Sequence, residues 1–126
     1  MSDILLCSHH PAQLLWLENS FRCANYTCRI TTEWDVLLGV MRCSYVDAVL
    51  FDAAMYDPEY RCRQIRAITA TPLIVLGANG TIEEELTLRA AGADEVICAE
   101  VVFEALLARV ESTLYQSRAV GDRYSD

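Results

Sequence analysis

The residues best placed to do chemistry lie near the end of one apolar stretch. Asp52 follows residues 48–51, four apolar residues in a row, a pattern typical of a strand buried on both faces of a parallel sheet. In open α/β sheets, functional side chains gather at the carboxyl ends of the strands. His9 and His10 follow an earlier apolar run, and Cys98 ends a later one. We therefore expect any reactive site to lie around Asp52.

Two interpretations of these side chains remain open. Imidazole, thiolate and carboxylate groups suit zinc, so His9, His10, Asp52 and Cys98 could form a soft-metal site. The alternative is two loop histidines and a buried strand thiol. We favour the alternative, because a metal site needs matched geometry that spacing alone does not establish. We therefore predict no bound metal.

The composition narrows the class of protein. A length of 126 residues fits one domain, and a hydrophobic content of 53% excludes a disordered chain. The net charge of −8 argues against direct contact with nucleic acid, which needs a basic face. No apolar run reaches the length of a membrane span. The first residues lack a charged segment and a cleavage site, so we expect no secretory signal. The six cysteines form no C-x-x-C pair, so we expect buried thiols in a cytoplasmic protein.

Hydrophobic periodicity predicts alternating strands and helices. The expected strands are residues 4–7, 26–31, 46–52, 73–76 and 94–98. Three helices are expected at residues 11–23, 33–43 and 101–115, the second with Thr32 as its N-cap. Between the second and the last, one helix is expected with Cys62, Ile65 and Ile68 facing inward. Another is expected to begin with a capping box of Thr81 and Glu84 and to end at Gly92. Right-handed crossovers then give an α/β, doubly wound, parallel five-stranded sheet in the order 2-1-3-4-5. We assign residues 1–118 to this domain and residues 119–126 to a tail or the start of a linker.

Five local motifs occur in an order that resembles a known family. They are residues 48–52 (Ala-Val-Leu-Phe-Asp), 62–68 (Cys-Arg-Gln-Ile-Arg-Ala-Ile), 71–76 (Thr-Pro-Leu-Ile-Val-Leu), 90–95 (Ala-Ala-Gly-Ala-Asp-Glu) and 106–110 (Leu-Leu-Ala-Arg-Val). Over residues 3–116 the chain resembles the receiver domains of bacterial two-component response regulators, with the flavodoxin-like or CheY-like (βα)5 fold. The fourth and fifth motifs resemble the subfamily with a winged-helix DNA-binding domain.

The resemblance implies a phosphorylation pocket, and most of it is missing. In the family, an Asp on the third strand accepts a phosphoryl group, two acids hold magnesium, and a Thr or Ser and a Lys bind the phosphoryl oxygens. Asp52 matches the acceptor, but Ser8 and His9 stand in place of the two acids. Gly77 replaces the hydroxyl residue, and Ala99 replaces the lysine. Because this transfer brings anions together, it needs a metal and a cation.

We therefore predict a degenerate receiver that does not run the phosphorylation cycle. Magnesium is not expected, because neither a hydroxyl nor an imidazole replaces two carboxylates. The aromatic switch residue of the family aligns with Val96. Asp52 would then serve as a polar cap at a strand end, bonded to nearby backbone N–H groups or to His9.

The same resemblance implies a symmetric dimer through the fourth helix, fifth strand and fifth helix. The candidate interface residues are Glu85, Arg89, Asp94, Glu95, Ala105 and Arg109, with Arg118 as a further one. Two of them depart from the family, since Glu85 stands where a base is usual and Ala105 where an acid is usual. The loss of one exposed bridge could be offset by apolar contact. We therefore expect a homodimer.

These observations predict a signalling and dimerisation module, not an enzyme. The resemblance implies that it is the regulatory half of a transcription regulator, which would bind DNA only through an output domain outside this sequence. A free-standing adaptor that binds another protein is one alternative. A metal or ligand sensor that uses the vacated pocket with His9, His10 and Cys98 is another.

Overall fold

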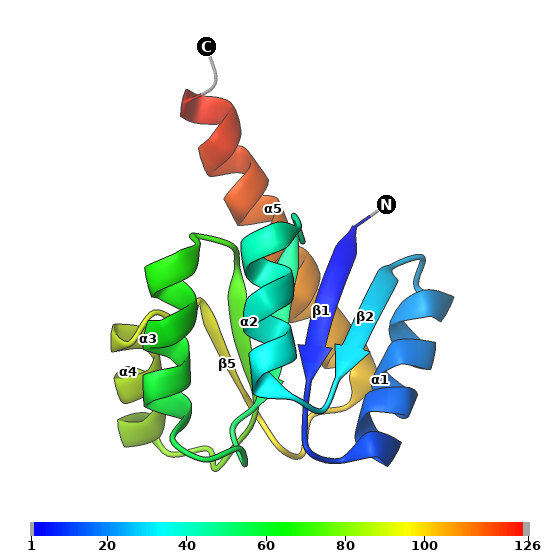
Figure 1. Cartoon of the computed structure of the whole chain (residues 1–126), viewed down its shortest axis with the longest axis vertical. Helices are drawn as coiled ribbons and strands as arrows, with labels where there is room; N and C mark the ends of the chain where they lie inside the picture. The colour runs from blue at the N-terminus through cyan, green and yellow to red at the C-terminus, as the bar shows by residue number, and fades with distance from the viewer. Residues whose placement is uncertain (1, 125–126) are drawn as a thin grey trace.

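Strands and helices alternate along the chain, as predicted. The computed structural model describes the backbone of residues 2–124 and the side chains of residues 2–117. Its elements are β1 (Asp3–Cys7), α1 (Pro11–Cys23), β2 (Thr27–Thr31), α2 (Trp34–Cys43), β3 (Ala48–Asp52), α3 (Pro58–Ile68), β4 (Leu73–Ala78), α4 (Ile82–Ala90), β5 (Glu95–Cys98) and α5 (Phe103–Tyr124) (Figure 1).

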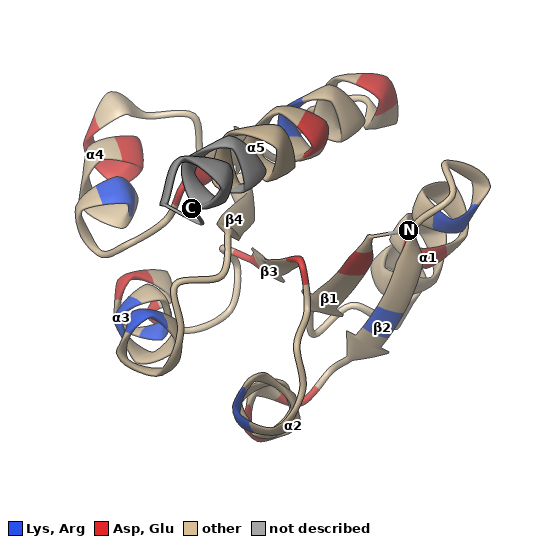
Figure 2. Ribbon diagram, turned by 90° about the horizontal axis from the view of Figure 1, so that it is seen from above, with Lys and Arg blue, Asp and Glu red and all other residues tan. Residues whose placement is uncertain are grey.

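The strands form one parallel sheet in the order β2-β1-β3-β4-β5. Figure 2 shows α1 and α5 on one side of this sheet and α2 and α3 on the other. The predicted fold class and strand order are therefore confirmed. With every strand parallel, all the carboxyl ends meet at one edge, and Asp52 lies there at the end of the central strand.

Alternate residues of the strands supply two separate cores. One core packs under α2, α3 and α4, and its strand residues include Leu5, Cys7, Val49, Phe51, Leu73 and Val75. The other packs under α1 and α5, and its strand residues include Ile4, Leu6, Ala48, Leu50, Ile74 and Leu76. Because both faces of β3 are covered, all five of its residues are buried. This burial fixes the position from which Asp52 emerges.

Several element boundaries differ from the predictions; β3 and α5, for example, each begin two residues later than expected. Helix α2 is preceded by Glu33, which provides no side-chain cap, so Thr32 is not its N-cap. Helix α4 ends at Ala90, before Gly92. Strand β4 continues to Ala78, two residues past the predicted end, because it pairs with β5 as far as Cys98. Helix α5 continues to Tyr124. The predicted domain boundary after residue 118 stays a prediction, because the side chains from there on lie outside the described residues.

The start of α4 shows half of the predicted capping box. The Thr81 hydroxyl accepts a hydrogen bond from the Glu84 backbone N–H at 3.2 Å, as expected. The Glu84 carboxylate does not return to Thr81; it accepts the Asn79 N–H at 2.7 Å. Both interactions fix the loop between β4 and α4. In the part of the chain that the structure describes, no helix combines the length and the apolarity that a membrane span needs.

Candidate functional site

Asp52 is a buried acid held by two hydrogen bonds. Its side chain lies at the end of β3, and the residue is only 5% exposed. Oδ1 accepts the Ala54 backbone N–H at 2.9 Å, and Oδ2 accepts the Ser8 hydroxyl at 3.2 Å. The backbone N–H partner matches one of the two predicted roles for this acid, and the alternative partner, His9, is exposed. The carboxylate is therefore anchored inside the fold.

Ser8 occupies the place of a metal-binding acid and is used as a structural hydroxyl. It is 2% exposed and accepts the His10 backbone N–H at 3.1 Å. Its oxygen also lies 3.1 Å from the Gln13 side-chain oxygen. A hydroxyl has one proton, so Ser8 can donate to Asp52 or to Gln13 but not to both at once. Sequence reasoning missed Gln13, although its place in the first turn after Pro11 puts it at this edge of the sheet.

The donors around Asp52 do not fit magnesium. This ion prefers oxygen ligands in octahedral geometry and is usually held by carboxylates. The two aligned positions offer the neutral Ser8 hydroxyl, which is already bonded to Asp52, and the exposed His9 imidazole. Within the described residues, no three His, Cys, Asp or Glu side chains form a group that could hold a metal ion. The soft-metal interpretation with His9, His10 and Cys98 thus gains no support from the geometry.

Gly77 belongs to β4 and lies against Asp52. Its φ of +75° is in the left-handed region, which favours glycine. A Cβ atom built on Gly77 would lie only 2.8 Å from Asp52 Oδ1. The carboxylate thus occupies the space that a side chain at position 77 would need. The hydroxyl expected here in the family is absent, and its place is filled.

No lysine is available to clamp a phosphoryl group. Ala99 follows β5, and its backbone N–H donates to the Ala78 carbonyl at 3.1 Å. The full sequence contains ten basic residues, all of them arginine. Arg61 donates from Nε to the Tyr56 carbonyl at 2.6 Å, and its guanidinium lies 4.7 Å from the centre of the Trp34 ring. Among the described residues, no cation forms an ion pair with Asp52.

The buried thiols are not nucleophiles at neutral pH. Burial raises the pKa of the Cys7 thiol, which lies near this edge of the sheet, to about 11; the Arg61 charge opposes this shift, and the Glu33 and Asp52 charges add to it. Burial likewise raises the pKa of Cys28 to about 11 and that of Cys62 to about 12. Only the thiolate reacts, so these groups are inert. The expected burial is wrong for Cys23, Cys43 and Cys98, which are exposed.

Comparisons with known proteins agree with this fold. No protein-family model matches the chain. A response regulator from Clostridium difficile superposes with a TM-score of 0.85 at 16% identity, covering 93% of this chain and 98% of that one. A receiver domain protein from Methanospirillum hungatei gives 0.86 at 18% identity, covering 94% and 98%. The chain therefore has the fold of a response regulator receiver domain.

One curated relative is a transcription regulator. The transcriptional regulatory protein YxdJ of Bacillus subtilis is 27% identical over 108 residues, which are 84% of this chain and 46% of that protein. The receiver thus spans about half the length of this relative. The receiver domain of the sensor histidine kinase PA1611 from Pseudomonas aeruginosa, which has a magnesium ion coordinated in its active site cleft, gives a TM-score of 0.78 at 20% identity, covering 90% and 97%.

The face of α4, β5 and α5 has a chain of ion pairs within one subunit. Arg89 contacts Glu85 at 3.5 Å and Glu95 at 3.0 Å, and Arg109 also pairs with Glu95. Four of the predicted interface residues are thus brought together. Asp94 differs, because its carboxylate binds Arg66 of α3. Ala105 is exposed on α5, and the side chain of Arg118 lies outside the described residues.

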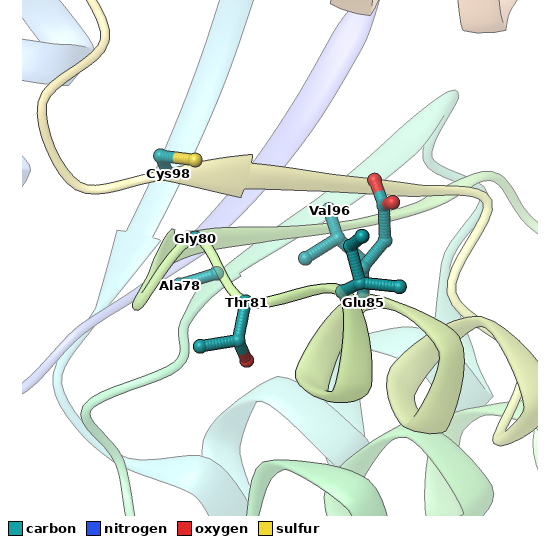
Figure 3. A pocket seen from close by; sticks show the side chains of 7 residues that line it. Ala78, Gly80, Thr81, Glu85, Val96 and Cys98 are labelled. Atoms are coloured by element: carbon teal, nitrogen blue, oxygen red, sulfur yellow. The ribbon is translucent and has the colours of Figure 1, made fainter.

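Two exposed apolar side chains and a small cavity lie beside this ion-pair chain. Ile82 and Leu86, one turn apart on α4, are 73% and 61% exposed. A cavity of about 70 Å³ lies between the ends of β4 and β5 and the start of α4 (Figure 3). Its lining includes Val96, which aligns with the aromatic position of the family. Sequence reasoning missed Ile82 and Leu86. Their i, i+4 spacing puts them on one face of α4, away from the buried Leu88, and this spacing is the signal for an exposed apolar stripe.

Proposed function

We propose that this receiver passes on a signal through protein contacts and does not accept a phosphoryl group. One observation carries the proposal: the acid at the acceptor position is buried and bonded to Ser8 and Ala54. An acceptor must present a free carboxylate oxygen in line with the incoming phosphorus atom. Here each oxygen has a hydrogen-bond partner, and Oδ1 also lies against Gly77.

The electrostatics of the transfer support the same proposal. A phosphoryl donor brings several negative charges towards the Asp52 carboxylate, and catalysis consists mainly in neutralising and positioning them. The aligned positions supply a hydroxyl, an exposed imidazole, a glycine and an alanine. The chain has a net charge of −8, which adds to the repulsion of an anionic donor. The proposed role is therefore that of a non-enzymatic, phosphorylation-independent module.

We propose further that two copies associate through the face of α4, β5 and α5. A twofold interface needs one patch that complements itself, and this face offers acids, arginines and two exposed apolar residues side by side. Ile82 and Leu86 supply apolar contact area, which stabilises association more than exposed ion pairs do. A dimer of this kind needs no phosphoryl group to form.

The relative YxdJ supports a role in transcription for the intact protein. We propose a cytoplasmic regulator whose DNA-binding half lies outside this sequence, because the receiver itself is acidic and matches only part of that relative. A free-standing adaptor that binds a partner protein is the alternative. The reading frame after residue 126 separates the two, since a winged-helix sequence supports the regulator and a stop codon supports the adaptor.

The phosphorylation part of the proposal is tested by intact-mass spectrometry. We expect no added phosphoryl group after incubation with magnesium and a small phosphodonor, under conditions that fully modify a receiver with a complete pocket. Asp52→Asn, which removes the acceptor, is the matched control. Stoichiometric addition to the native chain that is absent from Asp52→Asn would overturn the proposal.

A further inference from the structure

The contact between Asp52 and Gly77 joins two neighbouring strands at the degenerate pocket. Strand β3 pairs with β4 so that Asp52 lies opposite Leu76, the residue before Gly77. The Asp52 carboxylate then reaches along β4, where its Oδ1 lies 2.8 Å from the position of a Cβ on Gly77. Real Cβ atoms do not come this close to an oxygen. Any side chain at position 77 would therefore have to displace the carboxylate.

The backbone at Gly77 is fixed independently by the sheet. The pairing of β4 with β5 shifts between Val75, which pairs with Val96, and Ala78, which pairs with Cys98. Strand β4 thus advances three residues while β5 advances two, as in a β-bulge. Gly77 lies inside this irregular stretch with a φ of +75°. Because the bulge fixes the backbone at residue 77, it also fixes the direction in which a side chain at this position would point.

The Asp52 side chain is equally fixed. Its two hydrogen bonds come from Ala54 in the loop after β3 and from Ser8 in the loop after β1. The backbone N–H of Ala53, the residue that follows Asp52, donates to the Leu76 carbonyl at 2.7 Å. These contacts hold the carboxylate against β4. An Asp52 side chain that moved away would lose them while its charge remained near a buried edge, which is costly.

We infer that Gly77 is a positioning residue for Asp52. Because Gly77 has no side chain, the Asp52 carboxylate can lie in the space that a side chain at position 77 would need, and the two cannot share it. This deepens the proposed function and rests on it, because the chain itself then holds the acceptor carboxylate in a fixed place. With the backbone of this chain at a φ of +75°, a hydroxyl residue at position 77 would clash with the Asp52 carboxylate in its present place. Replacing Gly77 by serine or threonine alone would therefore lower the stability of the domain and would not restore the pocket.

A double-mutant cycle tests this coupling by urea unfolding. Gly77→Ala is expected to lower the folding equilibrium constant at least about 100-fold with Asp52 present, since left-handed strain alone accounts for roughly 5- to 30-fold. In the Asp52→Ala background the same change should cost only that strain. Gly80→Ala is the matched control, because Gly80 has a φ of +84° and its Cβ would meet Cys98 Sγ at an ordinary 3.5 Å. Gly77→Ser should behave like Gly77→Ala.

Each outcome decides the inference. If Gly77→Ala does not fold but its combination with Asp52→Ala does, the coupling is supported. Equal losses in both backgrounds, a loss equal to that of Gly80→Ala, or a double variant that fails to fold while Asp52→Ala folds would overturn it. The experiment contains no magnesium and no phosphodonor. Its failure would therefore leave the phosphorylation result untouched, and the two proposals fail separately.

Discussion

Arg66→Ala is expected to lower the free energy of unfolding by about 2–4 kcal/mol, because hydrogen bonds to charged groups contribute about 1.5–3 kcal/mol each and are not additive. The Arg66 guanidinium donates to the Gly92 carbonyl at 2.8 Å and to the Thr71 carbonyl at 2.5 Å. It also pairs with Asp94 at 2.5 Å. One side chain thus joins the end of α3 to the loops that enter β4 and β5.

The controls for Arg66 separate this linking role from charge alone. Arg63 lies on the same helix, is more exposed and pairs only with Glu59, one turn away, so Arg63→Ala should cost no more than about 0.5 kcal/mol. Arg66→Lys keeps the charge but lacks the planar fork that reaches several carbonyls, so it should recover only part of the loss. Equal urea midpoints for Arg66→Ala and Arg63→Ala would contradict the assignment.

Leu86→Glu is expected to raise the dimer dissociation constant at least about 100-fold, because twofold symmetry counts each lost apolar contact twice and burying a leucine contributes about 1.5–3 kcal/mol. Leu86 is exposed on α4 next to Glu85 and Arg89, within the ion-pair chain of the proposed interface. A second acid on this face would also repel its symmetry mate. Sedimentation equilibrium at several concentrations measures the effect.

The matched control for Leu86 lies on the other side of the sheet. Leu15 on α1 is 54% exposed, so Leu15→Glu makes the same chemical change on a surface outside the proposed interface. It should leave self-association unchanged. A native chain that stays monomeric at high micromolar concentration, or equal weakening by both variants, would remove the support for this interface.

The sequence was most informative where local signals and burial agree. Pro11 at the start of α1 and the spacing of Leu14, Leu17 and Phe21 predicted that helix with its observed bounds and buried face. The apolar residues before Asp52 predicted a strand covered on both sides. In each case one short segment contains both the propensity and the core pattern, so no distant contact is needed to place it.

The sequence was less informative where contacts outside the local pattern decide the structure. Gly77 lies past the end of the strand predicted at residues 73–76, but β5 pairs with β4 beyond this residue and draws it into the sheet as a bulge. Glu84 was expected to bond back to Thr81, but the Asn79 N–H lies within reach and takes its carboxylate. Asp94 stays a predicted interface residue, but the sequence did not predict that its carboxylate pairs with Arg66, 28 residues away, within the subunit.

From the sequence, the candidate site could be predicted only as a phosphorylation pocket that lacks most of the family's residues. Alignment with the receiver pattern identified Ser8, Gly77 and Ala99 as losses around a surviving Asp52. It did not show that Asp52 itself fills the space next to Gly77, because that depends on the register between β3 and β4 and on a side-chain direction. The structure adds that the Asp52 carboxylate takes up the space that a side chain at position 77 would need.

The central claim is that the receiver fold remains while its metal-assisted chemistry is lost. Crystals soaked with magnesium and beryllofluoride, a phosphoryl mimic, test it most directly. We predict that no ion binds to Asp52 and that its hydrogen bonds to Ser8 and Ala54 persist. A magnesium ion about 2.1 Å from an Asp52 oxygen, with the mimic beside it, would contradict the account.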